Sequence, residues 1–190
     1  MTQQVSTDNA YSVDVLMQQA RQLAANYRRA TGKTLSGVSS ELAVYDAIRL
    51  LHLNAVADQV GYDAIGTEQS GDLHNDKIQI KGRTVFKDVK STLRIGQLKM
   101  EQNWDSVVLV LLNDDYEPFE LYEIDRLTLS ENVIDKQSKK AKKGAMTVAR
   151  FKKIATLAWS IEWSAKQQND IEDSIASDAD MSRVGQSHSL

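Results

Sequence analysis

The run SVVLVLL at residues 106–112 constrains the fold more than any other stretch of this chain. It has no polar residue after its first position, and its three valines favour extended backbone over helix. A strand with apolar side chains on both sides is covered on both faces, whereas a half-exposed strand alternates apolar and polar residues. The run therefore predicts a central strand with a packed layer on each face of its sheet.

Patterns around this run predict the remaining strands. The alternation FELYEI at residues 119–124, after Pro118 at a strand start, predicts a neighbouring strand. Residues 62–66 and 77–85 read as two strands joined by the turn-rich segment SGDLHND, which predicts a hairpin. Residues 125–163 are expected to be helical in pieces around a basic segment.

Two helices are expected before these strands. Apolar residues recur at helical spacing over residues 13–27, and Gly32 suits the turn that ends this helix. A second helix is expected over residues 39–53, begun by a serine cap and apolar around most of its circumference. Its solvent side would carry Asp46 and Arg49. The whole order predicts an α/β fold with helices packed on a mixed sheet.

Composition limits the class of protein. A chain of 190 residues with 42% apolar residues suits one domain, expected at residues 11–163 between a flexible N-terminus (1–10) and an acidic, disordered tail (164–190). The absence of cysteine excludes disulfide scaffolds and thiolate zinc sites. We expect a soluble cytoplasmic protein that does not enter membranes, because no apolar run is long enough to span a bilayer and the N-terminus is unlike a secretory signal.

The second strand of the predicted hairpin carries a polar face. Side chains alternate along a strand, so Gln79, Lys81 and Arg83 should point to one side of the sheet. If the turn is centred near Asp72, then Asp63 lies opposite Lys81 on the neighbouring strand, with Gln79 diagonal to it. Asp72 itself reads as a structural turn residue, as does Asp76.

These side chains suit phosphodiester hydrolysis. Carboxylate and carboxamide oxygens from Asp63 and Gln79 can hold Mg²⁺ or Mn²⁺, and the metal stabilises charge on the phosphate. The ammonium of Lys81 can orient the attacking water and offset developing charge. Each residue also has a plain structural reading, since Asp63 can start a strand after a turn and Lys81 can be a solvated lysine.

The residues Glu41, GYDAI (61–65) and IQIKGR (78–83) resemble the PD-(D/E)XK, or restriction-endonuclease-like, nuclease superfamily over about residues 39–124. The resemblance implies a sandwich with a central mixed β-sheet flanked by helices. It implies that Asp63, Gln79, Glu41 and the backbone carbonyl of Ile80 hold the metal, that Lys81 is the catalytic lysine, and that restriction or phage defence is the setting.

One position departs from the family pattern. Gln79 is neutral where the family has an acid, which weakens the attraction for Mg²⁺ and gives Glu41 more importance as a second charge. Glu41 is equally well explained as an acid in the first turn of a helix, where it offsets the helix dipole.

A segment without acids lies between Lys136 and Lys153 and would contact a nucleic-acid backbone, although a charge run is more often a solvated surface. The residues expected to bind nucleic acid are Arg83, Lys139, Lys140, Lys142, Lys143, Arg150, Lys152 and Lys153.

The function expected from these features is a Mg²⁺-dependent endonuclease acting on DNA, with a homodimer as an option because double-strand cleavage needs two active sites. A catalytically inactive DNA-binding module of the same fold is the alternative, motivated by the neutral Gln79. A third reading is a protein-interaction domain whose acidic tail engages a partner or masks the basic segment.

Overall fold

Six strands form a single mixed sheet in the computed structural model, which describes residues 12–57, 61–89, 92–98, 100–132 and 146–162. The strands lie across the sheet in chain order: β1 Asn54–Ala55, β2 Ala64–Ile65, β3 Lys77–Thr84, β4 Ser106–Leu112, β5 Pro118–Asp125 and β6 Thr156–Ser160. β3 and β4 run parallel, and the other neighbouring strands are antiparallel. All of β4 is buried, which confirms the predicted central strand.

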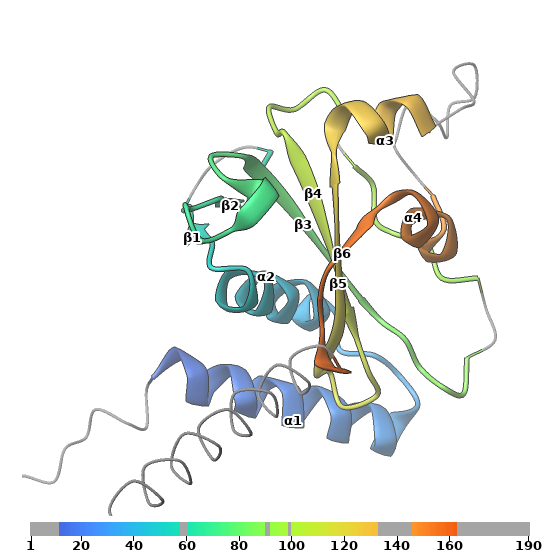
Figure 1. Cartoon of the computed structure of the whole chain (residues 1–190). Coiled ribbons are helices and arrows are strands. Elements are labelled where there is room, and N and C mark those ends of the chain that lie inside the picture. Colours follow the sequence, from blue (N-terminus) through green and yellow to red (C-terminus); the bar gives the residue numbers. More distant parts are fainter. Residues whose placement is uncertain (1–11, 58–60, 90–91, 99, 133–145, 163–190) are drawn as a thin grey trace, which may run out of the picture.

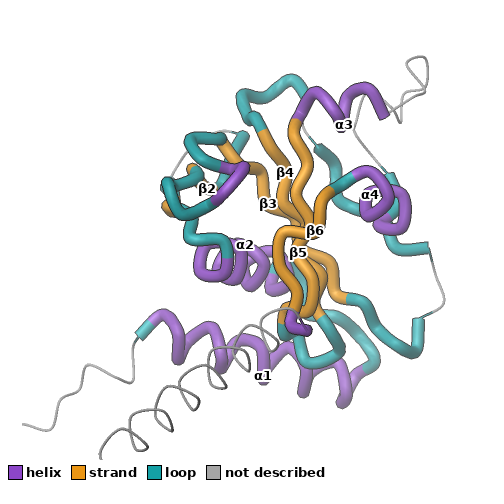
Figure 2. Tube along the Cα trace, in the orientation of Figure 1, coloured by secondary structure: helices purple, strands orange, loops and turns teal. Residues whose placement is uncertain are grey.

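Helices cover both faces of this sheet (Figures 1 and 2). They are α1 Val13–Thr31, α2 Val38–Leu50, α3 Arg126–Asn132 and α4 Val148–Ile154. Alternate residues of β4 belong to two core clusters: Val108 packs in the cluster of α1 and α2, whereas Leu109 packs with α3 and α4. The described chain is therefore a mixed α/β fold, as expected, with one apolar core on each side of the sheet.

Local sequence signals explain where the first helix begins and ends. The Ser12 side chain accepts a hydrogen bond from the backbone N–H of Val15, which satisfies one free donor of the first turn. Gly32 adopts a left-handed conformation (φ 70°), and its N–H donates to the carbonyl of Arg28. The predicted end of this helix is confirmed. In α2, by contrast, the cap position is Gly37, which has no side chain to cap the helix, so the expected serine cap is wrong.

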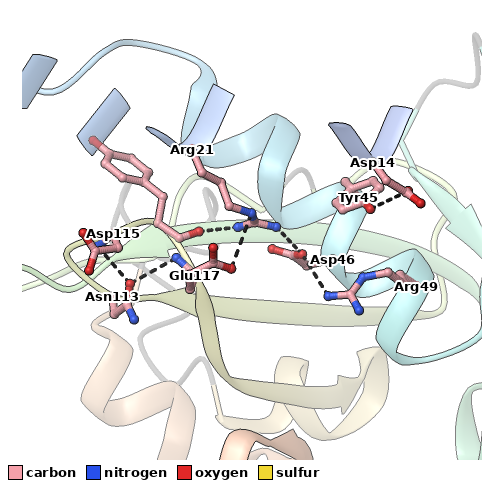
Figure 3. A network of polar contacts seen from close by, with 9 residues as sticks. Asp14, Arg21, Tyr45, Asp46, Arg49, Asn113, Asp115 and Glu117 are labelled. Atoms are coloured by element: carbon pink, nitrogen blue, oxygen red, sulfur yellow. Dashed lines mark hydrogen bonds and ion pairs between the residues drawn. The ribbon is translucent and has the colours of Figure 1, made fainter. Parts of the chain in front are cut away.

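Asp46 was expected on the solvent side of the second helix, and this is wrong because its exposed fraction is 0%. α1 packs on that side of α2 and brings Arg21 to the carboxylate, as Figure 3 shows. The Arg21 guanidinium also donates to the carbonyl of Tyr116 and lies 3.5 Å from Glu117 Oε2. Arg49 does remain half exposed. The helical pattern could not reveal this, because a charged residue on a helix is buried only when another element supplies its partner.

β6 corrects a second expectation. Residues 125–163 were expected to be helical in pieces, and α3 and α4 are present, but Thr156–Ser160 is a strand that pairs antiparallel with β5. This strand lies at the edge of the sheet and is at most partly buried, so its sequence TLAWS lacks the strong apolar run of a central strand. Short edge strands of this kind carry a weak sequence signal.

Several predictions fall on residues outside the described ranges. They concern the flexible N-terminus, the acidic tail, and Lys139, Lys140, Lys142 and Lys143 in the basic segment. Within the described ranges, no helix combines the length and the apolar character needed to cross a membrane.

Candidate functional site

The polar face of β3 lies on the side of the sheet covered by α3 and α4. Ile78 and Ile80 pack with α1 and α2, and a Cβ atom built on Gly82 would lie 2.5 Å from Ala43 Cβ of α2. Even-numbered residues of β3 therefore face α2, and the absence of a side chain at Gly82 lets helix and strand approach closely. Gln79, Lys81 and Arg83 consequently face the opposite side, as alternation predicts.

The register of β2 against β3 differs from the expected one by two residues. Ala64 pairs with Ile78, so the continuation of the ladder sets Asp63 beside Gln79 rather than opposite Lys81. The backbone agrees, because Asp63 N–H donates to the Ile78 carbonyl at 2.8 Å. The turn is thus centred one residue earlier than expected, at residue 71, where a 3₁₀ turn, Gly71–Leu73, begins. A shift of two residues does not exchange the faces of paired strands, so the residue beside Asp63 is still one of the polar face of β3.

The carboxylate of Asp63 lies against the backbone of β3. Asp63 Oδ2 accepts a hydrogen bond from the N–H of Ile80 at 2.7 Å. No hydrogen bond to Asp63 Oδ1 is found within the described residues. Asp63 therefore contacts the N–H of the residue whose carbonyl was expected to contact a metal, and one carboxylate oxygen remains for another contact.

Gln79 is almost completely buried, with 3% of its surface exposed. Its Nε2 donates to the carbonyl of Gly61 at 3.0 Å, which fixes the orientation of the carboxamide. Its Oε1 is buried and has no hydrogen-bond partner. A buried oxygen without a donor costs free energy, about 1–3 kcal/mol, so a native structure that keeps one has a reason to do so.

The segment at residues 100–104 covers this part of the site. Gly61 has a positive φ of 108°, and a Cβ atom there would lie 2.8 Å from Gln102 Cβ, so only glycine allows this approach. The Arg126 guanidinium holds the segment by donating to the carbonyls of Met100, Gln102 and Trp104, and it stacks on the Trp104 ring at 4.7 Å. Sequence reasoning missed this role because backbone carbonyls leave no residue-type signal.

Arg83 is a cation without a carboxylate partner among the described residues. Its Nε donates to the carbonyl of Arg94 at 2.6 Å, and its Nη1 donates to the carbonyl of Gly82. A Cβ atom on Gly96 would lie 2.7 Å from Arg83 Nη2 and 3.9 Å from Lys81 Cδ, so both basic side chains border this glycine. Burial lowers the pKa of Arg83 from its ordinary value. The site therefore presents a partly desolvated positive charge that an anion would stabilise.

Glu41 stands apart from these residues. It lies exposed on α2, the helix that covers the other face of β3, and no hydrogen bond or ion pair joins it to Asp63 or Gln79 in the described ranges. Among the described residues, no three His, Asp or Glu side chains are grouped so that they could hold a metal ion. Of the side chains expected to hold a metal, Asp63 and Gln79 thus come from adjoining segments, and Glu41 does not join them.

Of the basic residues predicted to contact nucleic acid, three lie on α4. The segment at residues 93–95 pairs with residues 146–148, through the Ile95 N–H to the Met146 carbonyl at 3.0 Å. This pairing connects the start of α4 to the segment that holds Arg83 (Figure 1). Arg150 and Lys153 are exposed, whereas Lys152 forms an ion pair with Glu120 at 2.6 Å. Their charges therefore lie on the same side of the sheet as Lys81.

An acidic cavity of about 210 Å³ lies at the end of β5 and was not foreseen. Glu123 lines it together with Asp72, Asp76 and Asp125, and the Ser106 hydroxyl donates to Asp76. Burial, with the nearby Asp72 and Asp76, raises the pKa of Glu123 to about 6. Two of these acids lie on β5 and two in the turn between β2 and β3, so they leave no sequence motif, because their proximity arises from that turn folding over the end of β5.

Comparisons with known proteins leave the family open. No protein-family model matches the chain, and a search of curated proteins finds no significant match.

Proposed function

We propose that this protein is a metal-dependent endonuclease that hydrolyses DNA phosphodiester bonds. One observation carries the proposal: Gln79, whose buried carboxamide oxygen has no donor, lies in β3 between the two residues whose backbone Asp63 contacts, with Lys81 and Arg83 next along the same face of β3. An acid, a second oxygen ligand, an ammonium and a guanidinium are the groups that phosphodiester hydrolysis uses.

The oxygens at the site fit a hard divalent cation. Mg²⁺ prefers oxygen ligands and commonly binds through one or two carboxylates together with water and phosphate oxygens. Asp63 and Gln79 Oε1 would hold Mg²⁺ or Mn²⁺, with the Ile80 carbonyl as a further ligand. When bound, the metal would supply stabilisation of the negative charge on the phosphate.

The remaining roles belong to the basic side chains. Lys81 would position the attacking water and offset charge as the phosphate oxygens become more negative. Arg83 would hold a phosphate, because its guanidinium is partly desolvated and lacks a carboxylate partner among the described residues. Arg150 and Lys153 would extend the contact along the DNA backbone, together with the lysines outside the described residues.

The arrangement of elements also supports the proposed restriction-endonuclease-like fold. A helix that packs on β3, an antiparallel β2–β3 pair and a parallel β3–β4 pair surround the residues that resemble the family motifs. A fold alone does not carry an activity, so the proposal depends on the site.

The test is nicking of supercoiled plasmid in the presence of Mg²⁺ or Mn²⁺. We expect activity in the natural chain, its loss by at least about 100-fold in Lys81→Ala, and full activity in Lys33→Ala, an exposed lysine beyond the end of α1. Equal nicking by the two variants would refute the assignment of the site.

A catalytically inactive DNA-binding module is the second candidate, and one observation favours it. Asp63 contacts the β3 motif through the Ile80 N–H, but the described residues contain no group of three acidic or histidine side chains that could hold a metal, and Glu41 does not join Asp63. Titration with Mn²⁺ separates the two candidates. A nuclease is expected to bind Mn²⁺ saturably through Asp63, and Gln79→Glu is expected to bind it more tightly because it adds a charge. DNA binding without nicking, with no Mn²⁺ site that Asp63→Ala removes, would favour the inactive module.

A further inference from the structure

Arg126 follows the last residue of β5 and turns its side chain back onto the segment at residues 100–104. Its Nη1 donates to the Gln102 carbonyl at 2.8 Å and to the Trp104 carbonyl at 3.0 Å, and its Nη2 donates to the Met100 carbonyl. A guanidinium offers its N–H donors in a fixed planar arrangement. One side chain therefore sets the positions of three carbonyls relative to one another.

The segment is fixed to the core and to β3 at its C-terminal end. Trp104 is buried in the core cluster of α3 and α4, and the Arg126 guanidinium lies 4.7 Å from the centre of its ring. The backbone N–H of Arg126 donates to the Asp105 carbonyl at 2.8 Å. Asp105 in turn donates its N–H to the Lys77 carbonyl, and its Oδ2 accepts from the Lys77 N–H. Arg126 thus joins the core to the start of β3, two residues before Gln79.

The same segment lies directly against Gly61. A Cβ atom on Gly61 would lie 2.8 Å from Gln102 Cβ and 3.4 Å from the Asn103 backbone nitrogen, so the two backbones approach closely. The carbonyl of Gly61 accepts the hydrogen bond from Gln79 Nε2 at 3.0 Å. The position of the segment therefore affects the carbonyl that orients the Gln79 carboxamide.

The orientation of this carboxamide decides which of its two terminal atoms is available to a ligand. With Nε2 on the Gly61 carbonyl, Oε1 of Gln79 is left buried and without a donor among the described residues. The terminal torsion of glutamine is broad, so a carboxamide without its partner would be free to rotate and exchange nitrogen for oxygen. A divalent cation such as Mg²⁺ binds the oxygen, whereas the NH₂ group is only a donor. Fixing the Gly61 carbonyl thus fixes the ligand atom.

We propose that Arg126 is a positioning residue for Gln79. Through the segment at residues 100–104 it holds the Gly61 carbonyl in place, and so keeps Gln79 Oε1 available to a ligand. The orientation of Gln79 depends on these contacts alone, whereas its consequence for metal binding rests on the proposed function. Groups that orient a metal ligand typically change the metal affinity by about 10- to 100-fold when they are removed.

The side-chain NH₂ signals of Gln79 report this orientation without metal or DNA. They are identified in proton–nitrogen NMR spectra of the full chain by their loss in Gln79→Met. In Arg126→Met, we expect these protons to exchange with solvent at least about tenfold faster than in the natural chain, while the backbone amides of β4 keep their protection. Unchanged exchange of the Gln79 protons in a folded Arg126→Met variant would overturn the proposal.

A milder variant keeps the test decisive if Arg126→Met does not fold. Arg126→Lys retains the charge but not the planar donors that hold three carbonyls, so the same exchange should still accelerate several-fold. Two controls should leave it unchanged: Gln102→Ala retains the backbone carbonyl and the Cβ atom, and Arg29→Met removes only an exposed ion pair with Asp115. Exchange that accelerates equally in Arg29→Met, or in no folded variant of Arg126, would overturn the proposal.

Titration with Mn²⁺ tests the consequence for the site. We expect Arg126→Met to bind Mn²⁺ at least about tenfold more weakly than the natural chain. In a Gln79→Glu background the same substitution should cost much less, because both terminal atoms of a glutamate are oxygens and rotation exchanges one for the other. An equal loss in both backgrounds would overturn the positioning role. If the natural chain binds no Mn²⁺, the proposed function fails, and the exchange of the Gln79 protons still decides the role of Arg126.

Discussion

Two buried polar groups lie on opposite faces of the same sheet and differ in what surrounds them. On the α1 and α2 face, the Asp46 carboxylate is paired with the Arg21 guanidinium, which also binds the carbonyl of Tyr116 (Figure 3). On the other face, the Gln79 carboxamide binds one carbonyl and lies beside Asp63. The first group links α1, α2 and the turn before β5. The second links the turn before β2 to β3 alone.

A buried oxygen without a donor occurs on both faces, so this feature alone does not identify a site. Asp46 Oδ2 lacks a hydrogen bond, as does Gln79 Oε1. The charge of Asp46 is nevertheless offset by Arg21 and by Arg49 at 3.7 Å. Gln79 is uncharged and forms no ion pair. The charged residues near it are Asp63, Lys81 and Arg83, which are arranged along β3. The difference indicates a structural role for Asp46 and motivates the ligand-binding role that we propose for Gln79.

The largest expected change in the free energy of unfolding comes from breaking the buried Arg21–Asp46 ion pair. Arg21→Met should lower the free energy of unfolding by about 3–5 kcal/mol, because it leaves the buried Asp46 carboxylate without its main partner. Urea denaturation measures this change. The control, Arg29→Met, removes an exposed ion pair with Asp115 and should cost at most about 1 kcal/mol. In the double variant Arg21→Met with Asp46→Leu, most of the loss should be recovered. Additive losses would contradict the structural role.

Replacing a buried acid that has no ion-pair partner should stabilise the protein, whereas replacing Arg21 destabilises it. Glu123 has no ion pair within the described residues, and burial with Asp72 and Asp76 raises its pKa to about 6 from an ordinary 4.5. The folded state then binds more protons than the unfolded state between these values, so the contribution of Glu123 to stability falls as pH rises from about 4.5 to 6.

Glu123→Gln should therefore raise the free energy of unfolding at pH 7 by at most about 2 kcal/mol, and by nothing below pH 4.5. Urea denaturation across this pH range measures the difference. A variant that is equally stabilised at pH 4 and pH 7 would show that the ionisation of the buried Glu123 is not the cause.

The smallest expected change in stability belongs to the candidate site. Gln79→Met removes one hydrogen bond and one buried oxygen without a donor, so the two effects should nearly cancel, within about 1 kcal/mol. The same variant should lose Mn²⁺ binding. A loss of several kcal/mol would mean that Gln79 supports the fold as Asp46 does, and the contrast between the two faces would disappear.

Several features could be predicted from the sequence because they depend on local chemistry. The uninterrupted apolar run of β4 required cover on both faces, and Gly32 ended α1 through its freedom at positive φ. The polar face of β3 followed from the alternation of side chains, which is a property of any strand. The register with β2 was predicted two residues away from its true position, yet the face was retained because the period of a strand is two.

Other features required contacts between distant segments. Helical periodicity alone treats Leu23 as core and Asp46 as solvent-facing, but Leu23 is 61% exposed and Asp46 is fully buried. The direction in which α1 packs on α2 decides both outcomes. The roles of Gly61 and Arg126 were also invisible, since they act through backbone carbonyls that every residue possesses.

The sequence by itself thus determined the layered α/β architecture and the set of polar side chains that share one face of β3. Backbone geometry and apolar burial dictate both, and they operate within a few residues. Only the tertiary structure decided that Asp63 lies beside Gln79, that Glu41 stands apart from them and that Arg83 lacks a carboxylate partner among the described residues. Such contacts depend on strand register and helix packing, which are set by the summed interactions of the whole core.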